Sequence, residues 1–387
     1  MCSIVQDYFG NLFTSELGEL DPIVLADVQR CVTQDMNTGL LAPFSYEEVK
    51  KALFQIGDLK APGPDGLHVV FFKRFWNLLG DDLVAEVLEV VNRCKVPDSW
   101  NDTTIVLIPK VNNPTLVSQF CPISLCNVVY KVISKMLANR LGAILPEIIS
   151  DHQSAFIPGR LITDNILIAY ESMHRIKKKC GKRGLCAIKL DMHKAYDRVE
   201  WNFLAKIMLK MGFNRRWVQL IMACVSSVKY NVRFNSMETG VFTPTRGLRQ
   251  GDPLSPYLFL FVAEGLSSLL KGGKTRGEID GIRVCRDAPE VSHLLFADDS
   301  LILIHAYKRN VDNLKHLLDS YCASSEQMVS DAKSSIFFSE NTSVSDKLEV
   351  CQSLNIMTES LNHKYLGLPA LVGADRSDCI QHLIDHV

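Results

Sequence analysis

The sequence predicts an α+β fold in which helices pack on one face of a small antiparallel sheet. Short runs rich in strand-forming residues and longer runs with helical spacing follow one another without strict strand–helix–strand alternation. The chain has 387 residues, of which 47% are hydrophobic. This length and composition are enough for a sizeable core and indicate two or three domains or subdomains.

The expected elements follow from local patterns along the chain. Residues 1–45 are mixed, with helical stretches, and Lys60–Gly66 is a rigid, turn-rich loop. Ser45 and Glu48 form a capping-box pattern that predicts a helix reaching about Phe54. Apolar spacing predicts further helices over 71–91, 128–145, 199–211, 217–225, 257–270 and 310–323. Strands are expected over 103–110, 184–191, 228–234 and 335–339, and near residue 282.

The stretch from His293 to His305 reads HLLFADDSLILIH and places two adjacent carboxylates inside an apolar run. Its two halves predict a tight β-hairpin with Asp298 and Asp299 at the tip. One interpretation is a turn that simply favours aspartate. The other is a metal site, because clustered carboxylates can hold Mg²⁺ through oxygen ligands. The metal interpretation requires at least one more carboxylate from elsewhere in the chain.

Asp191 closes an earlier expected strand and can supply that carboxylate. If its strand lies beside the hairpin, Asp191, Asp298 and Asp299 converge at one end of the sheet. Such a cluster is expected to bind two divalent cations, the arrangement used for nucleotidyl transfer. The sequence has no convincing Cys/His or Ser/His constellation, which suits this chemistry.

Composition argues against secretion, membrane insertion and structural cysteine sites. The N-terminus does not resemble a signal peptide, and the apolar segment Leu254–Leu270 is interrupted by Glu264 and too short to span a bilayer. The twelve cysteines contain no Cys-x-x-Cys pair, so neither a zinc site nor a disulfide framework is indicated. We therefore expect an intracellular protein with reduced thiols.

The charge balance gives no support to nucleic-acid binding, because the net charge is −1 and such proteins usually carry a basic footprint. One basic cluster extends from His174 to Arg183. It can be a solvated loop, a phosphate-contacting patch or a weak nuclear-import signal.

Three stretches resemble successive palm motifs of reverse transcriptases, most closely those of plant-type non-LTR (LINE-type) retrotransposons. They are Ile188–Trp201 (IKLDMHKAYDRVEW), Arg246–Pro256 (RGLRQGDPLSP) and Phe296–Asp299 (FADD). Further stretches match in order: Lys60–Gly66, Ile108–Lys110, Pro122–Lys131 and Lys364–Pro369. The joint order and spacing of these motifs, from about residue 30 to residue 372, make coincidence very improbable.

The resemblance implies an RNA-directed DNA polymerase with the right-hand architecture of fingers, palm and thumb. Residues 1–45 would be an N-terminal extension or linker remnant, 46–372 the fingers and palm around the sheet, and 373–387 the truncated start of a thumb. Endonuclease and RNase H regions would be lacking. The implied partners are an RNA template, a DNA primer and deoxynucleoside triphosphates, without a membrane, in the nucleus.

By resemblance, Asp191 and Asp298 would coordinate two Mg²⁺ ions, which Mn²⁺ could replace. Asp299 would be the more peripheral ligand, and the backbone carbonyl of Met192 would lie nearby.

The substrate-binding residues implied by the resemblance lie in the same motifs. Tyr196 matches the aromatic gate that crowds a 2′-hydroxyl, with ordinary core packing as its alternative. Gln250 and Gly251 match the loop that borders the incoming nucleotide. Arg249 either contacts template phosphate or is solvated, and Lys333 is either a proton donor to pyrophosphate or a surface lysine.

Several residues depart from the family pattern. Cys121 stands where an arginine is typical, His193 where a small residue is usual, and Glu326 where glycine is usual; Asp331 and Ala332 also differ. These departures leave a second interpretation, a catalytically inactive retroelement remnant that at most binds nucleic acid. An RNA-directed RNA polymerase is disfavoured by the implied gate.

Overall fold

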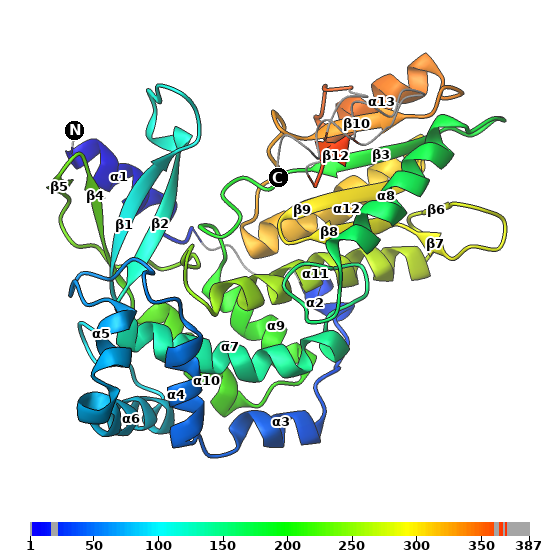
Figure 1. The fold of residues 1–387 in the computed structure, drawn as a ribbon. Helices are drawn as coiled ribbons and strands as arrows, with labels where there is room; N and C mark the ends of the chain where they lie inside the picture. The colour runs from blue at the N-terminus through cyan, green and yellow to red at the C-terminus, as the bar shows by residue number, and fades with distance from the viewer. Residues whose placement is uncertain (1, 17–21, 360–363, 367, 370–387) are drawn as a thin grey trace. The chain divides into compact units, whose positions relative to one another are not determined.

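The computed structural model describes residues 2–16, 22–359, 364–366 and 368–369 (Figure 1). Its helices are α1 (Cys2–Leu12), α2 (Pro22–Ala26), α3 (Gln34–Leu41), α4 (Tyr46–Gln55), α5 (Val69–Arg74), α6 (Trp76–Arg93), α7 (Val128–Ile148), α8 (Ile162–Lys177), α9 (Trp201–Met211), α10 (Arg215–Ser226), α11 (Ser255–Thr275), α12 (Lys308–Ser325) and α13 (Val344–Leu354). Its strands are β1 (Asp102–Pro109), β2 (Phe120–Cys126), β3 (Leu185–Leu190), β4 (Lys229–Phe234), β5 (Met237–Glu238), β6 (Ile282–Arg283), β7 (Glu290–Val291), β8 (His293–Phe296), β9 (Asp299–His305), β10 (Ser335–Phe338), β11 (Lys364–Tyr365) and β12 (Leu368–Pro369).

The chain divides into two compact units. The first comprises Met1–Gly18, Gln29–Ile148 and Tyr196–Val262, and the second comprises Glu19–Val28, Ile149–Ala195 and Ala263–Val387. The α+β class predicted from the sequence is confirmed, since both units combine helices with small sheets.

The first unit contains a four-stranded sheet in the order β2-β1-β4-β5. β1 pairs antiparallel with β2 but parallel with β4, so the expectation of antiparallel pairing does not hold throughout this sheet. Phe9 of α1 is fully buried in a core cluster with Ile105 of β1 and Tyr230 of β4. This N-terminal helix is therefore part of the unit's core. The division of the chain into 1–45, 46–372 and 373–387 stays a prediction, and residues 373–387 lie outside the described part of the chain.

The helix predicted after Ser45 is confirmed as α4, and its capping box forms as expected. The Ser45 hydroxyl accepts a hydrogen bond from the Glu48 backbone N–H, and the Glu48 carboxylate accepts one from the Ser45 backbone N–H. Glu48 also forms an ion pair with Arg140 of α7, with 2.8 Å between Nε and Oε1. The same carboxylate thus starts one helix and ties it to another.

The second unit contains a four-stranded sheet in the order β10-β3-β9-β8, with every neighbouring pair antiparallel (Figure 1). Alternate side chains point to opposite faces because the side-chain period of a strand is two. Ala187 and Leu303 lie in a core cluster with Met173 of α8. This face of the sheet is therefore covered by α8.

The opposite face of this sheet is also covered. Leu190 has the reverse orientation to Ala187 along β3, and it lines a cavity together with Leu318 and Cys322 of α12. Helices thus lie on both faces, so the prediction of helices on one face only is wrong for this sheet. Such an arrangement buries both sets of alternating apolar residues.

Most predicted elements are present with boundaries shifted by a few residues. The segment 71–91 is divided at Phe75 into α5 and α6. β2, which contains Pro122, and the helices α8 and α13 are additional to the elements expected from the sequence. Within the described part of the chain, no helix combines the length and apolarity needed to cross a membrane.

Candidate functional site

The antiparallel pairing of β3 with β9 brings Asp191 to the same end of the sheet as the aspartate hairpin. Leu190, the last residue of β3, lies opposite Ser300 of β9. Phe296 of β8 lies opposite Asp299, so residues 297 and 298 form the turn and Asp299 is the first residue of β9. Asp298 is exposed, whereas Asp191 and Asp299 are half-buried. The predicted hairpin and the predicted neighbouring strand are both confirmed.

Two lysines lie beside these carboxylates. Lys333 Nζ is 3.6 Å from an Asp191 carboxylate oxygen, and Lys189 Nζ is 3.9 Å from an Asp299 carboxylate oxygen. Burial raises the pKa of Asp299, Lys189 opposes this increase, and repulsion from Asp298 and Asp191 adds to it. The three carboxylates therefore interact electrostatically, and the lysines neutralise only part of their charge.

The chemistry of this donor set fits divalent cations, since carboxylate oxygens are the hard ligands that such ions prefer. In the residues that the structure describes, however, no three His, Cys, Asp or Glu side chains are grouped closely enough to hold one ion. The three carboxylates share one end of a sheet without converging on a common point. Their roles as ligands remain a prediction.

The backbone around Asp191 is held by the segment that precedes β10. The Ser330 N–H donates to the Asp191 carbonyl at 2.8 Å, and the Asp191 N–H donates to Ser334 Oγ at 3.2 Å. Met192 is buried and forms an isolated β-bridge with Val329. The carboxylate of Asp191 thus projects from a backbone that is fixed on one side. Lys333, on the same segment, is largely exposed, with 63% of its side-chain surface accessible.

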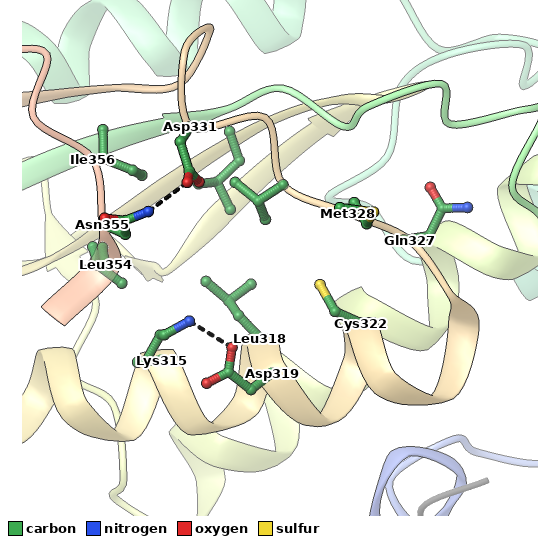
Figure 2. A pocket seen from close by; sticks show the side chains of 12 residues that line it. Lys315, Leu318, Asp319, Cys322, Gln327, Met328, Asp331, Leu354, Asn355 and Ile356 are labelled. Atoms are coloured by element: carbon green, nitrogen blue, oxygen red, sulfur yellow. Dashed lines mark hydrogen bonds and ion pairs between the residues drawn. The ribbon is translucent and has the colours of Figure 1, made fainter. Parts of the chain in front are cut away.

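A cavity of about 240 Å³ lies behind this segment, and Figure 2 shows its lining. Asp331 borders it and accepts a hydrogen bond from the side-chain amide of Asn355 at 2.5 Å. Lys315 and Asp319 of α12 form an ion pair at its rim. Asp331, one of the residues that differ from the family pattern, therefore has a nearby hydrogen-bond partner in the side-chain amide of Asn355.

The aromatic gate candidate, Tyr196, stacks on Phe259 of α11. The ring centroids are 4.8 Å apart and the rings are nearly parallel, with an interplanar angle of 12°. Tyr196 as a whole residue is half-buried. Tyr196 belongs to the first unit and Asp191 to the second, and the expectation that the ring lies beside the carboxylates stays a prediction.

Gln250 and Gly251 form a tight junction with strand β2. The Gln250 carbonyl accepts from the Ser124 N–H at 2.8 Å, and its side-chain oxygen accepts from the Cys121 thiol at 3.0 Å. The Gln250 amide donates to Asp197 Oδ1 at 3.1 Å. Gly251 has φ +110°, and a Cβ there would lie 3.1 Å from the Ser124 carbonyl oxygen. Glycine permits this backbone conformation and close approach, which other residues would not.

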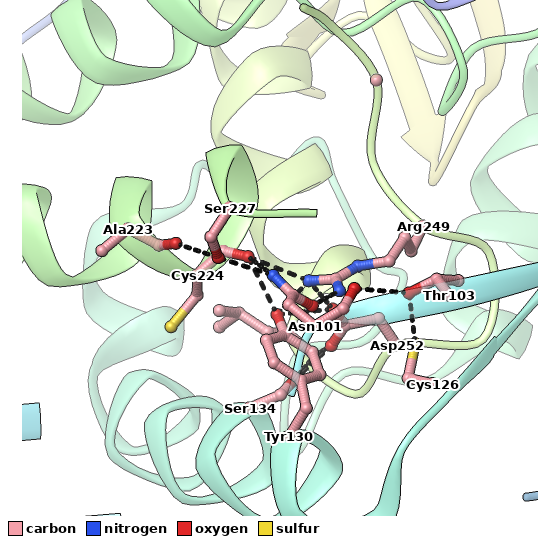
Figure 3. Close-up of polar contacts among 12 residues, drawn as sticks. Asn101, Thr103, Cys126, Tyr130, Ser134, Ala223, Cys224, Ser227, Arg249 and Asp252 are labelled. Carbon is pink, nitrogen blue, oxygen red and sulfur yellow. Dashed lines mark hydrogen bonds and ion pairs between the residues drawn. The ribbon is translucent and has the colours of Figure 1, made fainter. Parts of the chain in front are cut away.

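Arg249 is buried, and the structure supports neither of the two interpretations weighed for it, contact with phosphate and exposure to solvent. Its guanidinium forms an ion pair with Asp252 at 2.9 Å and donates to the Cys224 carbonyl at 3.0 Å. It also bonds to the side chains of Asn101 and Tyr130 (Figure 3). An arginine with this many enclosed partners holds the first unit together from inside.

The structure places a stretch without a recognisable motif, His152–Arg160 (HQSAFIPGR), against the hairpin. The side chain of Gln153 bonds to the backbone of Ala297, next to Asp298. Gln153 and Arg160 do not belong to a periodic apolar pattern. Within His152–Arg160, the Pro158-Gly159 pair indicates a turn. Their proximity could not be read from spacing.

Comparison with known proteins gives one family match. Residues 108–370 match the family model described as "Reverse transcriptase (RNA-dependent DNA polymerase)". The chain is 28% identical over 331 residues to the transposon TX1 uncharacterized 149 kDa protein of Xenopus laevis, covering 85% of this chain and 25% of that protein. It is 28% identical over 266 residues to a retrovirus-related Pol polyprotein from the type-1 retrotransposable element R2 of Popillia japonica, covering 67% of this chain and 35% of that protein.

Over a shorter stretch, the chain has a higher sequence identity to another protein. The chain is 53% identical over 66 residues to the uncharacterized mitochondrial protein AtMg01250 of Arabidopsis thaliana, covering 17% of this chain and 54% of that protein. The chain spans between about a quarter and about half of the length of these relatives.

Proposed function

We propose a function from one established premise: this chain belongs to the reverse transcriptase (RNA-dependent DNA polymerase) family. The proposed reaction is RNA-directed DNA synthesis, in which a primer 3′-hydroxyl attacks the α-phosphate of a deoxynucleoside triphosphate and pyrophosphate leaves. The observation that carries this proposal is the position of Asp191, Asp298 and Asp299 at one end of the β10-β3-β9-β8 sheet.

Family membership implies a polymerase that depends on a divalent metal, and we propose Mg²⁺ with Mn²⁺ as a substitute. Asp191 and Asp298 would hold two ions, with Asp299 as the more peripheral ligand and the Met192 carbonyl nearby. When bound, the ions would activate the attacking oxygen and neutralise the leaving pyrophosphate. Burial is the main cause of the raised pKa of Asp299, and repulsion from Asp298 and Asp191 adds to it. A bound cation would relieve that repulsion, which supports this proposal.

The remaining steps would use side chains of the chain itself. Lys333, 3.6 Å from Asp191, would donate a proton to pyrophosphate, and its exposure leaves it accessible to that group. Tyr196, braced by its stack on Phe259, would exclude ribonucleotides by crowding the 2′-hydroxyl. Gln250 and Gly251 would border the incoming nucleotide, with the side-chain orientation of Gln250 set by Cys121 and Asp197.

We further propose that the first unit supplies most of the fingers and the second unit the catalytic part of the palm. The template would be RNA and the primer DNA. The basic stretch from His174 to Arg183 would contact phosphate, and α8 carries its first four residues. Binding through such a stretch weakens as salt rises, because counterions are released.

Primer extension on an RNA template tests the proposal. The full chain is supplied with labelled DNA primer, deoxynucleotides and Mg²⁺, beside the variants Asp298→Ala and Asp287→Ala. Asp287 is an exposed aspartate on another loop of the second unit and serves as a matched control. We expect Asp298→Ala to reduce extension by at least about a hundredfold, as loss of a transition-state electrostatic group typically does, and Asp287→Ala to leave it unchanged.

Equal extension by wild type and Asp298→Ala would contradict the catalytic assignment. No extension with either Mg²⁺ or Mn²⁺, together with retained binding of the primer–template, would establish the alternative of an inactive nucleic-acid-binding remnant.

A further inference from the structure

The turn that carries Asp298 is held by a buried side chain from a distant loop. Gln153, which is 1% exposed, accepts a hydrogen bond at its Oε1 from the Ala297 N–H at 3.0 Å. Its Nε2 donates to the Ala297 carbonyl at 3.4 Å. One side-chain amide therefore bonds to both backbone polar groups of the residue that precedes Asp298.

Ala297 is a residue that needs such support. It has φ +53° and is the first of the two residues between β8 and β9, while Asp298 is not among the residues with positive φ. A positive φ at the first turn position favours glycine, because a Cβ there is strained. Alanine is strained in the left-handed region, because its Cβ lies too close to the following carbonyl oxygen. The hydrogen bonds from Gln153 offset this strain.

The loop that presents Gln153 is itself fixed. Arg160 donates to the carbonyls of Ile149, Ser150 and Gln153 at 2.7, 2.5 and 2.7 Å. The carbonyl of His152 accepts from the Leu295 N–H at 2.7 Å. One guanidinium therefore satisfies three of the carbonyls in this part of the chain, and β8 satisfies a fourth, which fixes the backbone around Gln153.

The loop also pairs with β8 as a short additional strand. Gln153 forms a parallel β-bridge with Leu295, and the Ser154 N–H donates to the Leu295 carbonyl at 3.1 Å. Asn165 of α8 donates to the same carbonyl at 3.0 Å. The two hydrogen bonds between the Gln153 side chain and Ala297 thus lie next to backbone hydrogen bonds between the loop and β8. These bonds limit how far Gln153 can move relative to the hairpin.

We propose that Gln153 is a positioning residue for Asp298 and Asp299: its amide holds the Ala297 turn so that the two carboxylates are presented in one orientation. Arg160 supports it by shaping the loop. The catalytic consequence of this inference rests on the proposed function. The hydrogen bonds between Gln153 and Ala297 can be tested without measuring activity. Residues that orient metal ligands typically contribute tenfold to a hundredfold in metal affinity or activity.

The test compares Gln153→Met with a matched control, Asn310→Leu. Asn310 is fully buried, and its side-chain amide donates to the His305 carbonyl at 2.8 Å and accepts from the Asp280 N–H at 2.8 Å. It therefore holds the far end of β9 by the same chemistry, away from the aspartates. Both variants remove a buried amide that bonds to backbone at one end of the same strand.

Three readouts are made on the full chain: hydrogen exchange of the Ala297 amide, titration with Mn²⁺ alone, and kcat and KM for primer extension. We expect Gln153→Met to expose the Ala297 amide to exchange, to weaken Mn²⁺ binding about tenfold or more, and to lower kcat with little change in KM. Asn310→Leu should reduce thermal stability without these effects. Adding Ala297→Gly to Gln153→Met should restore much of the loss, because glycine adopts the positive φ without strain.

Retained protection of the Ala297 amide in Gln153→Met, or equal weakening of Mn²⁺ binding by Asn310→Leu, would overturn the proposal. If Gln153→Met does not fold, Gln153→Asn replaces it: its amide is one methylene too short to reach Ala297, and the same loss of protection is expected. A wild-type chain that extends no primer would refute the proposed function, while the exchange measurement would still decide the role of Gln153.

Discussion

The imidazole ring of His152 lies stacked on that of His293, with centroids 4.1 Å apart and an interplanar angle of 13°. His293 is fully buried, and its two ring nitrogens bond to the hydroxyls of Ser267 and Ser292. Burial, together with Lys271 and Lys274, lowers the pKa of His152 to about 4, while Asp151 opposes this decrease. Burial and His152 likewise lower the pKa of His293. Both rings are therefore neutral in the fold at neutral pH.

This pair predicts a loss of stability in mild acid. Because the folded-state pKa of His152 lies below its unfolded value of 6.5, its contribution is fully present above 6.5 and is lost as the pH falls toward about 4. His152→Phe keeps a stacking ring but cannot titrate. The free energy of unfolding should therefore fall less in this variant than in the wild type as the pH decreases from 6.5 to 4. We expect the difference to be up to about 3 kcal/mol.

Urea unfolding at several pH values measures this effect. His316 is exposed on α12, and His316→Gln is the control for replacing a histidine elsewhere in the second unit. An unaltered acid slope in His152→Phe would show that other groups cause the loss.

Glu326 ends α12 in the left-handed conformation, with φ +55°, at a position where the resembled family usually has glycine. A residue with a Cβ is strained there, and glycine is not. We expect Glu326→Gly to stabilise the protein by roughly 1 kcal/mol, seen as a higher melting temperature.

The matched control for this substitution is Ala323→Gly, at an exposed position inside the same helix. It should destabilise the protein by roughly 0.5–1 kcal/mol, because glycine is unfavourable in a helix interior. A melting temperature lowered by both substitutions would contradict the strain argument.

Arg249 and Asp252 form a buried ion pair whose loss should be costly. Burial alone would lower the pKa of Arg249, but Tyr130 and Asp252 raise it, so the guanidinium stays charged. Arg249→Met leaves the Asp252 carboxylate without its cation, and such losses typically cost about 3–5 kcal/mol. The midpoint of urea unfolding should fall accordingly.

Arg233→Met provides the comparison, since Arg233 forms an exposed ion pair with Glu238 at 2.5 Å. Exposed pairs contribute less than about 1 kcal/mol. If Arg249→Met left stability intact and instead weakened binding to a primer–template, the phosphate-contact interpretation would be the correct one.

Tyr196 is predicted to set the choice of sugar in an active polymerase. Tyr196→Ala removes the ring that stacks on Phe259, and we expect a higher ratio of ribonucleotide to deoxynucleotide incorporation. Tyr196→Phe keeps the ring and the stack and should retain the wild-type ratio. Single-nucleotide extension with each triphosphate measures it, and an equal ratio in Tyr196→Ala and wild type would refute the gate.

Much of the fold could be predicted because its signals are local. The capping box of Ser45 and Glu48 is contained in four residues, and the apolar runs on either side of Asp298 specify a hairpin without reference to the rest of the chain. The candidate carboxylates were identifiable for the same reason, since a charged pair in an apolar run stands out in the sequence itself. Strand β2, whose third residue is Pro122, carried no such signal.

By itself, then, the sequence determined the α+β class, the hairpin and the family. Only the tertiary structure decided that Arg249 is enclosed with Asn101 and Tyr130, and that Gln153 bonds to Ala297. These partners are separated by more than a hundred residues, and no periodic pattern links them. The sequence does not show which polar side chains will be buried or which groups they will contact. Once the fold removes such a side chain from water, it needs a hydrogen-bond partner, because a buried unsatisfied polar group is costly.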